Sequence, residues 1–515
     1  MRIFDTYVQK LKYKVLTELA RQTWVGNDAF SVFNDIANQV VKKGEPTMSC
    51  CIYKDRAIVA ERIRIALGGK KEDHNVIQVI DIACDECPVA GHVVTDLCRG
   101  CVAHACVDAC KLGAITVDSH QKAEIDKSKC VECGKCAKSC PYSAIANFKR
   151  PCERACKVDA ISMAPDGVAQ IDSEKCIECG ACVYKCPFGA TLDVSSITDI
   201  IKTIVDSDNN KNYHVHAIVA PAIAGQFQYA KAGQLISAIR ELGFYAVEEV
   251  ALGADIVAYK EAQELQEKGF LTSSCCPAFV KYIKMKFPQL AEHISHNLSP
   301  MAETGKLIKE QDPDAKIVFI GPCTAKKGEV RKPEVHQYVD YVMTFEELQA
   351  MIDSKDIAVD QLPETELDTA TYYGRVFART GGLSEAVTEA VREQKAAAEA
   401  AKVDAPDGAG ASGAVASGEA GASGKPANGD GACDGDSADS KPFVFDPIVC
   451  DGIDSCKTAL LRASKGLLPN NFIEGMVCTD GCIGGAACLS HGNADKRAID
   501  NYGKKASHKE IRDVL

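Results

Sequence analysis

Cysteine is the residue that most constrains what this chain can fold into. Its 515 residues include 27 cysteines, and sixteen of them lie between Cys84 and Cys186 at short, repeating spacings. In a short secreted chain such a density would indicate disulfides. This chain is long, and its start, MRIFDTYVQKLKYKVL, has neither an apolar signal core nor a twin-arginine pair. We therefore expect reduced thiols that bind metal.

The first half of this stretch has the spacing of a two-cluster ferredoxin. Such proteins repeat C-x2-C-x2-C-x3-C-P, and the fourth cysteine of each run ligates the cluster of the other run. His104 lies between Cys101 and Cys106, where one run has two extra residues, and it could replace a thiolate, but the thiolates suffice. Buried free thiols or zinc explain the spacing less well. Crossing the two runs predicts two [4Fe-4S] clusters, one on Cys98, Cys101, Cys106 and Cys140 and one on Cys130, Cys133, Cys136 and Cys110.

The second half contains one regular run whose partner is split. Cys84 and Cys87, far upstream, can supply the missing C-x2-C element. The same crossing then predicts a third cluster on Cys176, Cys179, Cys182 and Cys156, and a fourth on Cys84, Cys87, Cys152 and Cys186. Residues 81–193 are thus predicted to be a ferredoxin-like domain that conducts single electrons. The substrate chemistry of the chain must then lie in another domain.

The rest of the chain predicts a multidomain α+β and α/β protein. Residues 1–80 have helical periodicity and no evident chemistry. Apolar, β-branched runs followed by glycine or proline, such as AKIVFIGPC, predict strand–loop–helix units in residues 194–394 and 442–515. Between them, residues 395–441 are nearly all Ala, Gly, Ser, Asp and Pro, which predicts a disordered insertion in which Cys433 has no function.

Charge and hydropathy exclude two classes of partner. The net charge of -12 argues against a nucleic-acid surface, which requires clustered Lys and Arg. No apolar stretch reaches the eighteen or more residues of a membrane span. We expect a cytoplasmic protein whose partners are small molecules and redox proteins.

Three loops in the α/β region carry further cysteines: TSSCCPAF, GPCTAKKGE and MVCTDGCIGGAAC. Together, and in this order, they resemble the signature loops of [FeFe] hydrogenases. The resemblance extends over about residues 98–505 and implies a two-lobed domain that binds the H-cluster, a [4Fe-4S] subcluster joined to a diiron unit with CO, cyanide and azadithiolate. It also implies maturation enzymes that install the diiron unit.

The resemblance assigns a role to each matching residue. Cys276, Cys323, Cys478 and Cys482 would ligate the subcluster, with Cys482 bridging to the diiron unit, and Cys275 would exchange protons with the azadithiolate. Lys326 would hydrogen-bond a cyanide. Met476 and the segment Ala220, Pro221 and Ala222 would lie beside the diiron unit. Two positions depart from the family, which often has methionine where this chain has Gly321 and usually has glycine where it has Ala278.

The resemblance also implies a proton route. Glu261 and Glu264 lie three apart on a predicted helix that leads into the Cys275 loop, so they project from the same side. A solvated acidic face is the simpler interpretation. However, their placement before Cys275, with Ser295 twenty residues after it, resembles the family's channel. The predicted order is Glu264, Ser295, Glu261, water, Cys275 and the azadithiolate amine.

The predicted function is reversible interconversion of protons and electrons with H₂, with a ferredoxin-like electron carrier. No GxGxxG motif followed by an acidic residue indicates a nicotinamide or flavin site. The alternatives are an iron–sulfur assembly factor or a hydrogen-sensing relative with little turnover. The other cysteines are predicted to be structural; they are Cys50, Cys51, Cys450, Cys456 and Cys488.

Overall fold

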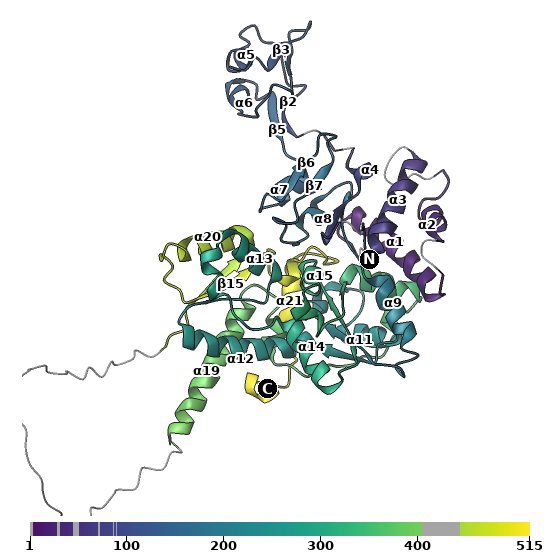
Figure 1. The fold of residues 1–515 in the computed structure, drawn as a ribbon, viewed down its shortest axis with the longest axis vertical. Coiled ribbons are helices and arrows are strands. Elements are labelled where there is room, and N and C mark those ends of the chain that lie inside the picture. The colour runs from purple at the N-terminus through teal and green to yellow at the C-terminus, as the bar shows by residue number, and fades with distance from the viewer. Residues whose placement is uncertain are drawn as a thin grey trace, which may run out of the picture.

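The computed structural model describes residues 4–27, 31–44, 51–70, 73–85, 87–88, 90–403 and 443–515. Cys50, Cys433 and most of the segment predicted as an insertion lie outside these residues. The remainder has the predicted mixed α/β class. An α/β domain forms one end, and two ferredoxin-type modules extend from it one after the other, so that the second module forms the far tip (Figure 1).

The N-terminal segment is helical and packs on the α/β domain. It contains α1 (Tyr7–Trp24), α2 (Phe33–Val40) and α3 (Ile52–Ala66). Thr6 caps α1 by accepting from the Gln9 backbone N–H at 3.1 Å. The apolar side of α1, with Val15, Leu16 and Leu19, is buried in one core with α9 (Ile197–Asp206) and α17 (Phe345–Ser354). The segment is therefore part of the domain's core and not an independent unit.

A buried charge cluster joins this segment to the other two parts. Lys12 Nζ on α1 lies 2.5 Å from Asp193 Oδ1 and 2.7 Å from Glu346 Oε2. Lys327 Nζ in the α/β domain lies 2.7 Å from Asp193 Oδ2 and 2.8 Å from Glu347 Oε1. Asp193 ends the ferredoxin-type region. Removing one member would leave a buried charge without its partner, which costs about 3–5 kcal/mol.

The module nearer the α/β domain, here the proximal module, combines residues before and after the tip. It contains β1 (Ile77–Val79), α4 (Asp81–Cys84), α7 (Pro151–Ala155), β6 (Ile161–Met163), β7 (Ala169–Ile171), α8 (Ala181–Lys185) and β8 (Thr191–Asp193). Strands β1 and β8 pair antiparallel, as do β6 and β7. Because β1 brings the upstream chain alongside β8, Cys84 and Cys87 reach the later cysteines.

The tip, residues 91–148, is the distal module. It contains β2 (Gly91–Val94), α5 (Ala105–Asp108), β3 (Ile115–Val117), β4 (Ala123–Ile125), α6 (Lys135–Ser139) and β5 (Ile145–Phe148). Strands β2 and β5 pair antiparallel, with Gly91 opposite Phe148, so the module leaves and rejoins the chain at neighbouring points.

The α/β domain has two parallel sheets, one in each predicted lobe. The first has the order β10-β9-β12-β13, and the second β11-β15-β14. Helices α9, α11 and α17 cover one face of the first sheet and α14 the other. The strands are β9 (Val215–Val219), β10 (Ala246–Glu249), β11 (Leu271–Thr272), β12 (Lys316–Gly321), β13 (Tyr341–Thr344), β14 (Pro447–Asp451) and β15 (Phe472–Met476).

The helices of this domain include the long α12 and α19, which pack together beside the second sheet. Helix α19 continues through the first residues of the low-complexity segment, whose remainder lies outside the described residues.

In the described part of the chain, no helix is both long and apolar enough to cross a membrane. The helices not yet given are α10 (Ile223–Gln226), α11 (Ala232–Glu241), α12 (Val250–Lys268), α13 (Pro277–Lys286), α14 (Pro300–Gln311), α15 (Ala325–Glu329), α16 (Pro333–His336), α18 (Tyr372–Val376), α19 (Gly382–Val403), α20 (Ile453–Ala463) and α21 (Asn493–Gly503), with 3-10 helices η1 (Pro288–His293), η2 (Val359–Gln361), η3 (Cys482–Gly484) and η4 (Ile511–Val514).

Candidate metal centre

A cavity of about 90 Å³ is lined by residues from both lobes, just beyond the carboxyl ends of β9, β12 and β15. Parallel sheets commonly bind ligands at this edge. Cys275, Cys276, Cys323 and Cys482 line it, although they come from three distant loops. Cys478 is partly buried and lies within electrostatic range of Cys276, Cys323 and Cys482. The structure therefore brings together the five cysteines to which the resemblance assigns a role.

Local geometry explains why these loops can converge. Cys276 precedes α13, whose first residue is Pro277, a position where the missing N–H of proline costs nothing. Cys323 follows β12 and precedes α15. A β-carbon on Gly485 would lie 2.5 Å from the Pro322 carbonyl oxygen. Glycine at that position lets the third loop pack directly on the second.

The thiols of the cavity are strongly desolvated. Burial raises the pKa of Cys323 to about 11 and the pKa of Cys482 to about 12, and it raises the pKa of Cys275 and Cys478 well above the usual value. Thiolates are the form that ligates metal, so a cation must offset this burial. Four soft thiolate donors around one buried space fit an iron–sulfur cluster.

Lys326 contributes a buried positive charge to the cavity wall. Its Nζ lies 2.6 Å from Glu329 Oε2, and the two groups form an ion pair. The angles between these atoms do not meet the geometry of a hydrogen bond. Burial opposes the charged form, but the Glu329 carboxylate outweighs it and raises the pKa of Lys326. The ammonium therefore keeps its charge and has N–H groups free to bind an anionic ligand.

Most of the other predicted cofactor contacts also border the cavity. Ala220, Pro221 and Met476 line it. Ala222, in contrast, is buried one residue further along, where α10 begins, and is not on the lining.

The cavity wall also explains a departure from the family. A β-carbon on Gly321 would lie 2.5 Å from Cζ of Phe319, whose ring lines the cavity. Phe319 thus fills space beside the second loop and leaves no room for a side chain at position 321. Sequence reasoning missed Phe319 because it reads as an ordinary residue of a buried strand.

A line of polar groups connects Cys275 with the surface. Glu261 on α12 is fully buried; its Oε1 accepts from the Ser274 N–H at 3.4 Å, and it interacts with both Ser295 and Cys275. Ser295 Oγ donates to Glu264 Oε2 at 3.2 Å. Burial raises the pKa of Glu261 to about 7, so this carboxyl can both give and take a proton near neutrality.

Glu264 lies at the outer end of this line, held by three neighbours, of which the sequence did not indicate His296 and Asn297. Lys268 Nζ and His296 Nδ1 each lie 2.7 Å from Glu264 Oε1, and Asn297 Nδ2 donates to Oε2 at 2.9 Å. Partial burial opposes ionisation, but Lys268 and His296 hold the pKa of Glu264 below its usual value. His296 is largely exposed, so the line reaches solvent there.

In the proximal module the split-run cysteines lie together. Cys84, Cys87, Cys152 and Cys186 line one small cavity with Arg150, whose Nη1 donates to Cys84 Sγ at 3.4 Å. The other predicted group also converges, since Cys182 interacts with Cys156, Cys176 and Cys179. Cys179 further interacts with Cys276. The proximal module therefore meets the thiol cavity directly.

This meeting is close because of one glycine. Gly180 has φ +75°, and a β-carbon there would lie 2.6 Å from Thr324 Oγ1 and 2.7 Å from Ala486 Cβ. Thr324 Oγ1 in turn donates to the Glu178 carbonyl oxygen at 2.7 Å. The ligand loop of the proximal module is thus seated on the second and third loops of the cavity.

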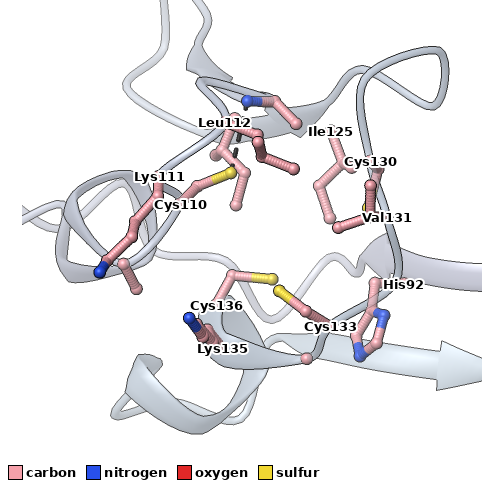
Figure 2. A pocket seen from close by; sticks show the side chains of 14 residues that line it. His92, Cys110, Lys111, Leu112, Ile125, Cys130, Val131, Cys133, Lys135 and Cys136 are labelled. Carbon is pink, nitrogen blue, oxygen red and sulfur yellow. Dashed lines mark hydrogen bonds between the residues drawn. The ribbon is translucent and has the colours of Figure 1, made fainter.

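In the distal module, Cys110, Cys130, Cys133 and Cys136 line a cavity of about 230 Å³ beside His92. Their side chains converge from two segments of the module (Figure 2). In the other predicted group, Cys106 interacts with Cys101 and Cys140. His104 Nε2 is buried with no partner among the described residues, but no contact joins it to these thiols.

One local hydrogen bond repeats at all four fourth-position cysteines. The backbone N–H four residues later donates to each sulfur, from Ala114 to Cys110, Ala144 to Cys140, Ala160 to Cys156 and Ala190 to Cys186, at 3.2–3.3 Å. Alanine at this position is a sequence signal that the cysteine spacing alone did not use. It makes Cys156 equivalent to the other three, although its own run is split.

The remaining described cysteines are not members of these groups, although Cys488 Sγ lies 3.7 Å from the Cys482 carbonyl oxygen. Cys450 and Cys456 are fully buried neighbours in the second lobe, and Cys456 Sγ lies 3.6 Å from the Met476 carbonyl oxygen. Cys488 is buried, and Cys51 is exposed. A group of converging thiols at the end of a row of ferredoxin-type modules defines an iron–sulfur protein of the electron-transferring kind.

Comparison with known proteins identifies the family. Residues 213–486 match the model of the iron only hydrogenase large subunit, C-terminal domain, and residues 97–144 and 150–190 match the 4Fe-4S dicluster domain. The chain belongs to the iron-only hydrogenase family.

Individual relatives are distant. Iron hydrogenase 1 of Clostridium pasteurianum is 30% identical over 319 residues, which are 56% of this chain and 54% of that protein. The periplasmic [Fe] hydrogenase large subunit of Nitratidesulfovibrio vulgaris is 29% identical over 277 residues, 49% of this chain and 61% of that one. The cytosolic Fe-S cluster assembly factor NAR1 of Kluyveromyces lactis is 37% identical over 95 residues, 18% of this chain and 20% of that one. The chain thus spans little more than half the length of these two hydrogenases.

A solved [FeFe]-hydrogenase structure from Chlamydomonas reinhardtii is also similar. The match covers 62% of this chain and 92% of the chain in that structure, with a TM-score of 0.45 and 19% identity.

Proposed function

We propose that this chain is an [FeFe] hydrogenase that interconverts protons and electrons with molecular hydrogen. The observation that carries the proposal is the buried carboxyl of Glu261. It interacts on one side with the Cys275 thiol at the cavity and on the other with Ser295, which donates to Glu264. A site that only stores or passes on a cluster does not need a buried acid connected to solvent.

The thiol cavity fits the H-cluster by its donor set. Cys276, Cys323, Cys478 and Cys482 would hold the [4Fe-4S] subcluster, with Cys482 also bridging to the diiron unit that maturation enzymes supply. When bound, this group provides the metal chemistry that forms and cleaves H₂. Lys326 offers its buried ammonium to a cyanide ligand, and Phe319 and Met476 exclude water from the cavity.

The chain's own residues move the protons. The lowered pKa of Glu264 keeps this carboxylate ionised, so it can accept a proton at the surface. It passes the proton through the Ser295 hydroxyl to Glu261. Glu261 delivers it through one water to the Cys275 thiol, the last protein group of the relay. Each of these groups can both give and accept a proton, as a reversible relay requires.

Electrons would travel through four [4Fe-4S] clusters held by the four cysteine groups. The distal module exchanges electrons with a ferredoxin-like carrier, and the Cys156/Cys176/Cys179/Cys182 cluster passes them to the cavity, where Cys179 lies within electrostatic range of Cys276. With the H-cluster, the matured chain should hold about 22 iron atoms. The described cysteines are all free thiols, which suits the reducing cytoplasm.

The assembly-factor alternative rests on the match to NAR1. Hydrogen evolution decides between the two functions. The chain, co-produced with the maturation enzymes and purified without oxygen, should evolve H₂ from a reduced viologen dye, and the unmatured chain should not. Fully metallated, matured protein that evolves no hydrogen would refute the proposal and favour the assembly role.

A further inference from the structure

A second cluster of metal-binding residue types lies at the opposite end of the first sheet. One ring nitrogen each of His214 and His216 and one carboxylate oxygen of Asp312 all lie within 4.8 Å of one another. His216 is the second residue of β9, His214 directly precedes the strand, and Asp312 directly follows α14. Side chains two apart on a strand point to the same face, so the two imidazoles approach Asp312 together.

His216 carries the clearest sign of a missing ligand. It is only 7% exposed, and its Nδ1 lies 2.8 Å from Glu248 Oε1. A carboxylate can only accept, so Nδ1 carries the proton and Nε2 presents a lone pair. That Nε2 has no hydrogen-bond partner among the described residues. Asp312 Oδ2 lies 3.8 Å from this Nε2, and a carboxylate oxygen is itself an acceptor.

A cation between these two atoms would remove the conflict. Zinc binds histidine nitrogen and carboxylate oxygen at about 2.0–2.2 Å, which puts two ligands of one ion about 3–4 Å apart. His214 Nδ1 lies 2.7 Å from the same Asp312 oxygen, and Tyr245 stacks on the His214 ring with centroids 3.8 Å apart. A small rotation of the half-exposed Asp312 or His214 side chain would complete the ligand set.

We infer that His214, His216 and Asp312 bind one divalent transition-metal ion of the Zn²⁺ class, with Glu248 orienting His216 through its Nδ1–H. Imidazole ligands select such ions over Mg²⁺ or Ca²⁺. A carboxylate behind a ligating histidine is the usual support of such a site, and its loss typically costs 10–100-fold in metal affinity, roughly.

The ion would fasten the first sheet and take no part in the chemistry of the cavity. It would join β9, β10 through Glu248, and the turn between α14 and β12. His216 lies four residues before Ala220 on β9, so the site is roughly 13 Å from the cavity wall at about 3.3 Å per residue. Metal binding here should therefore change stability and leave the cavity unaffected.

The test must separate this ion from zinc held by cysteines. Anaerobically purified, iron-loaded protein is titrated with Zn²⁺, and zinc content, zinc-edge X-ray absorption and melting temperature are measured. We expect one added Zn²⁺ per chain with only nitrogen and oxygen ligands, at about 2.0–2.1 Å, and a raised melting temperature. A shell containing sulfur at about 2.3 Å, or no added zinc, would overturn the inference.

Matched variants locate the ion. His216→Ala and Asp312→Asn should abolish this binding, Glu248→Gln should weaken it about 10–100-fold, and the exposed His336→Ala should bind as the parent does. Asp312→Asn keeps the shape of the side chain, so it tests the site even if His216→Ala fails to fold. Equal zinc binding by Asp312→Asn and the parent would refute the site.

Discussion

The distal module and the thiol cavity bind metal in opposite ways. In the distal module the cysteines come from short, repeated runs, and Cys133 is exposed to solvent. Large apolar side chains such as Val102, 96% exposed, and Val131, 65% exposed, surround them. In the cavity the thiols come from three distant loops, none of them is exposed, and burial raises the pKa of Cys275 and Cys478 well above the usual value.

This difference indicates a division of labour. Clusters near the surface can exchange electrons with a docked carrier, and exposed apolar groups are a common basis for such docking. A buried, water-excluded site suits bond-making chemistry, which needs fixed groups in a low dielectric. The proximal module, locked by the Lys12–Asp193–Lys327 cluster, joins the two. Changes in the cavity should therefore stop turnover with any donor, whereas changes at the tip should matter only for a protein donor.

The largest effect is expected from Cys275→Ala. Loss of the last proton-transfer group should lower hydrogen turnover by about 10²–10⁴-fold with a dye and with a protein carrier alike. Iron content and the CO and cyanide infrared bands should persist, because Cys275 is not a predicted ligand. Cys456→Ala removes another buried thiol of the same lobe and serves as the control. Loss of the infrared bands in Cys275→Ala would make Cys275 a ligand instead.

The next largest effect concerns the relay. Glu261→Gln and Glu264→Gln should each slow turnover by roughly a hundredfold, because an amide cannot pass the proton on. Cluster spectra should not change. Glu267→Gln, on the exposed part of the same helix, should have the parent rate. If both relay variants also turn over hydrogen at the parent rate, protons reach the cavity by another path.

Deleting the distal module tests the other side of the comparison. Because Gly91 pairs with Phe148, the ends left by removing residues 91–148 lie about 5 Å apart, and a short glycine linker can close them. Iron should fall from about 22 to about 14 atoms per chain. Turnover with a viologen dye should persist, while turnover with a ferredoxin falls to background. Equal loss with both donors would show that the tip supports the cavity.

A smaller effect is expected on stability. The pKa of Glu261 rises from 4.5 to about 7 on folding, so the folded chain holds a proton that the unfolded chain releases. This group's contribution to the free energy of unfolding is fully present below pH 4.5 and is lost as the pH rises through 7. Each unit of difference between the folded and unfolded pKa corresponds to about 1.4 kcal/mol of that contribution. The melting temperature of Glu261→Gln relative to the parent should rise between about pH 5 and about pH 8. A difference independent of pH would contradict a protonated Glu261.

No effect on turnover is expected from the low-complexity segment. After this segment the described chain resumes at Phe443, whose carbonyl oxygen accepts a hydrogen bond from Lys395 Nζ on α19. The eight residues of α19 that follow Lys395 span only about 12 Å, so the two ends to be joined are close. A linker of roughly eight Gly and Ser residues can therefore replace residues 404–442. Reduced hydrogen evolution in a folded, fully metallated deletion variant would reveal a function in this segment.

The same comparison explains what the sequence could predict. The cysteine crossing in the ferredoxin-like region follows from local spacing, and the structure places members of each predicted group near one another. The α/β class was predicted because buried strands followed by glycine or proline are visible in the sequence, and its two lobes were implied by the resemblance to the family. The start of the insertion was less clear, because an alanine-rich segment favours both helix and disorder; α19 in fact continues to Val403.

Other features depend on tertiary contacts that no spacing encodes. Phe319 becomes part of the cavity wall only because Gly321 lies beside its ring. The docking of α1 through Lys12 depends on Asp193 and Glu346, which are far away in the sequence. His296 and Asn297 meet Glu264 only when the loop after η1 folds against α12. The alanine four residues after each fourth cysteine was visible in the sequence, and it would have supported the position of Cys156.

Isotope exchange tests the central claim most directly, because it needs neither an electron carrier nor a chosen direction of catalysis. The matured chain, held under D₂ in ordinary water, should release HD and H₂, and the unmatured chain should release neither. Cys275→Ala should lose this exchange while keeping its infrared bands. A matured chain that holds its full iron and shows CO and cyanide bands, yet exchanges no isotope, would contradict the assignment of hydrogenase activity to this cavity.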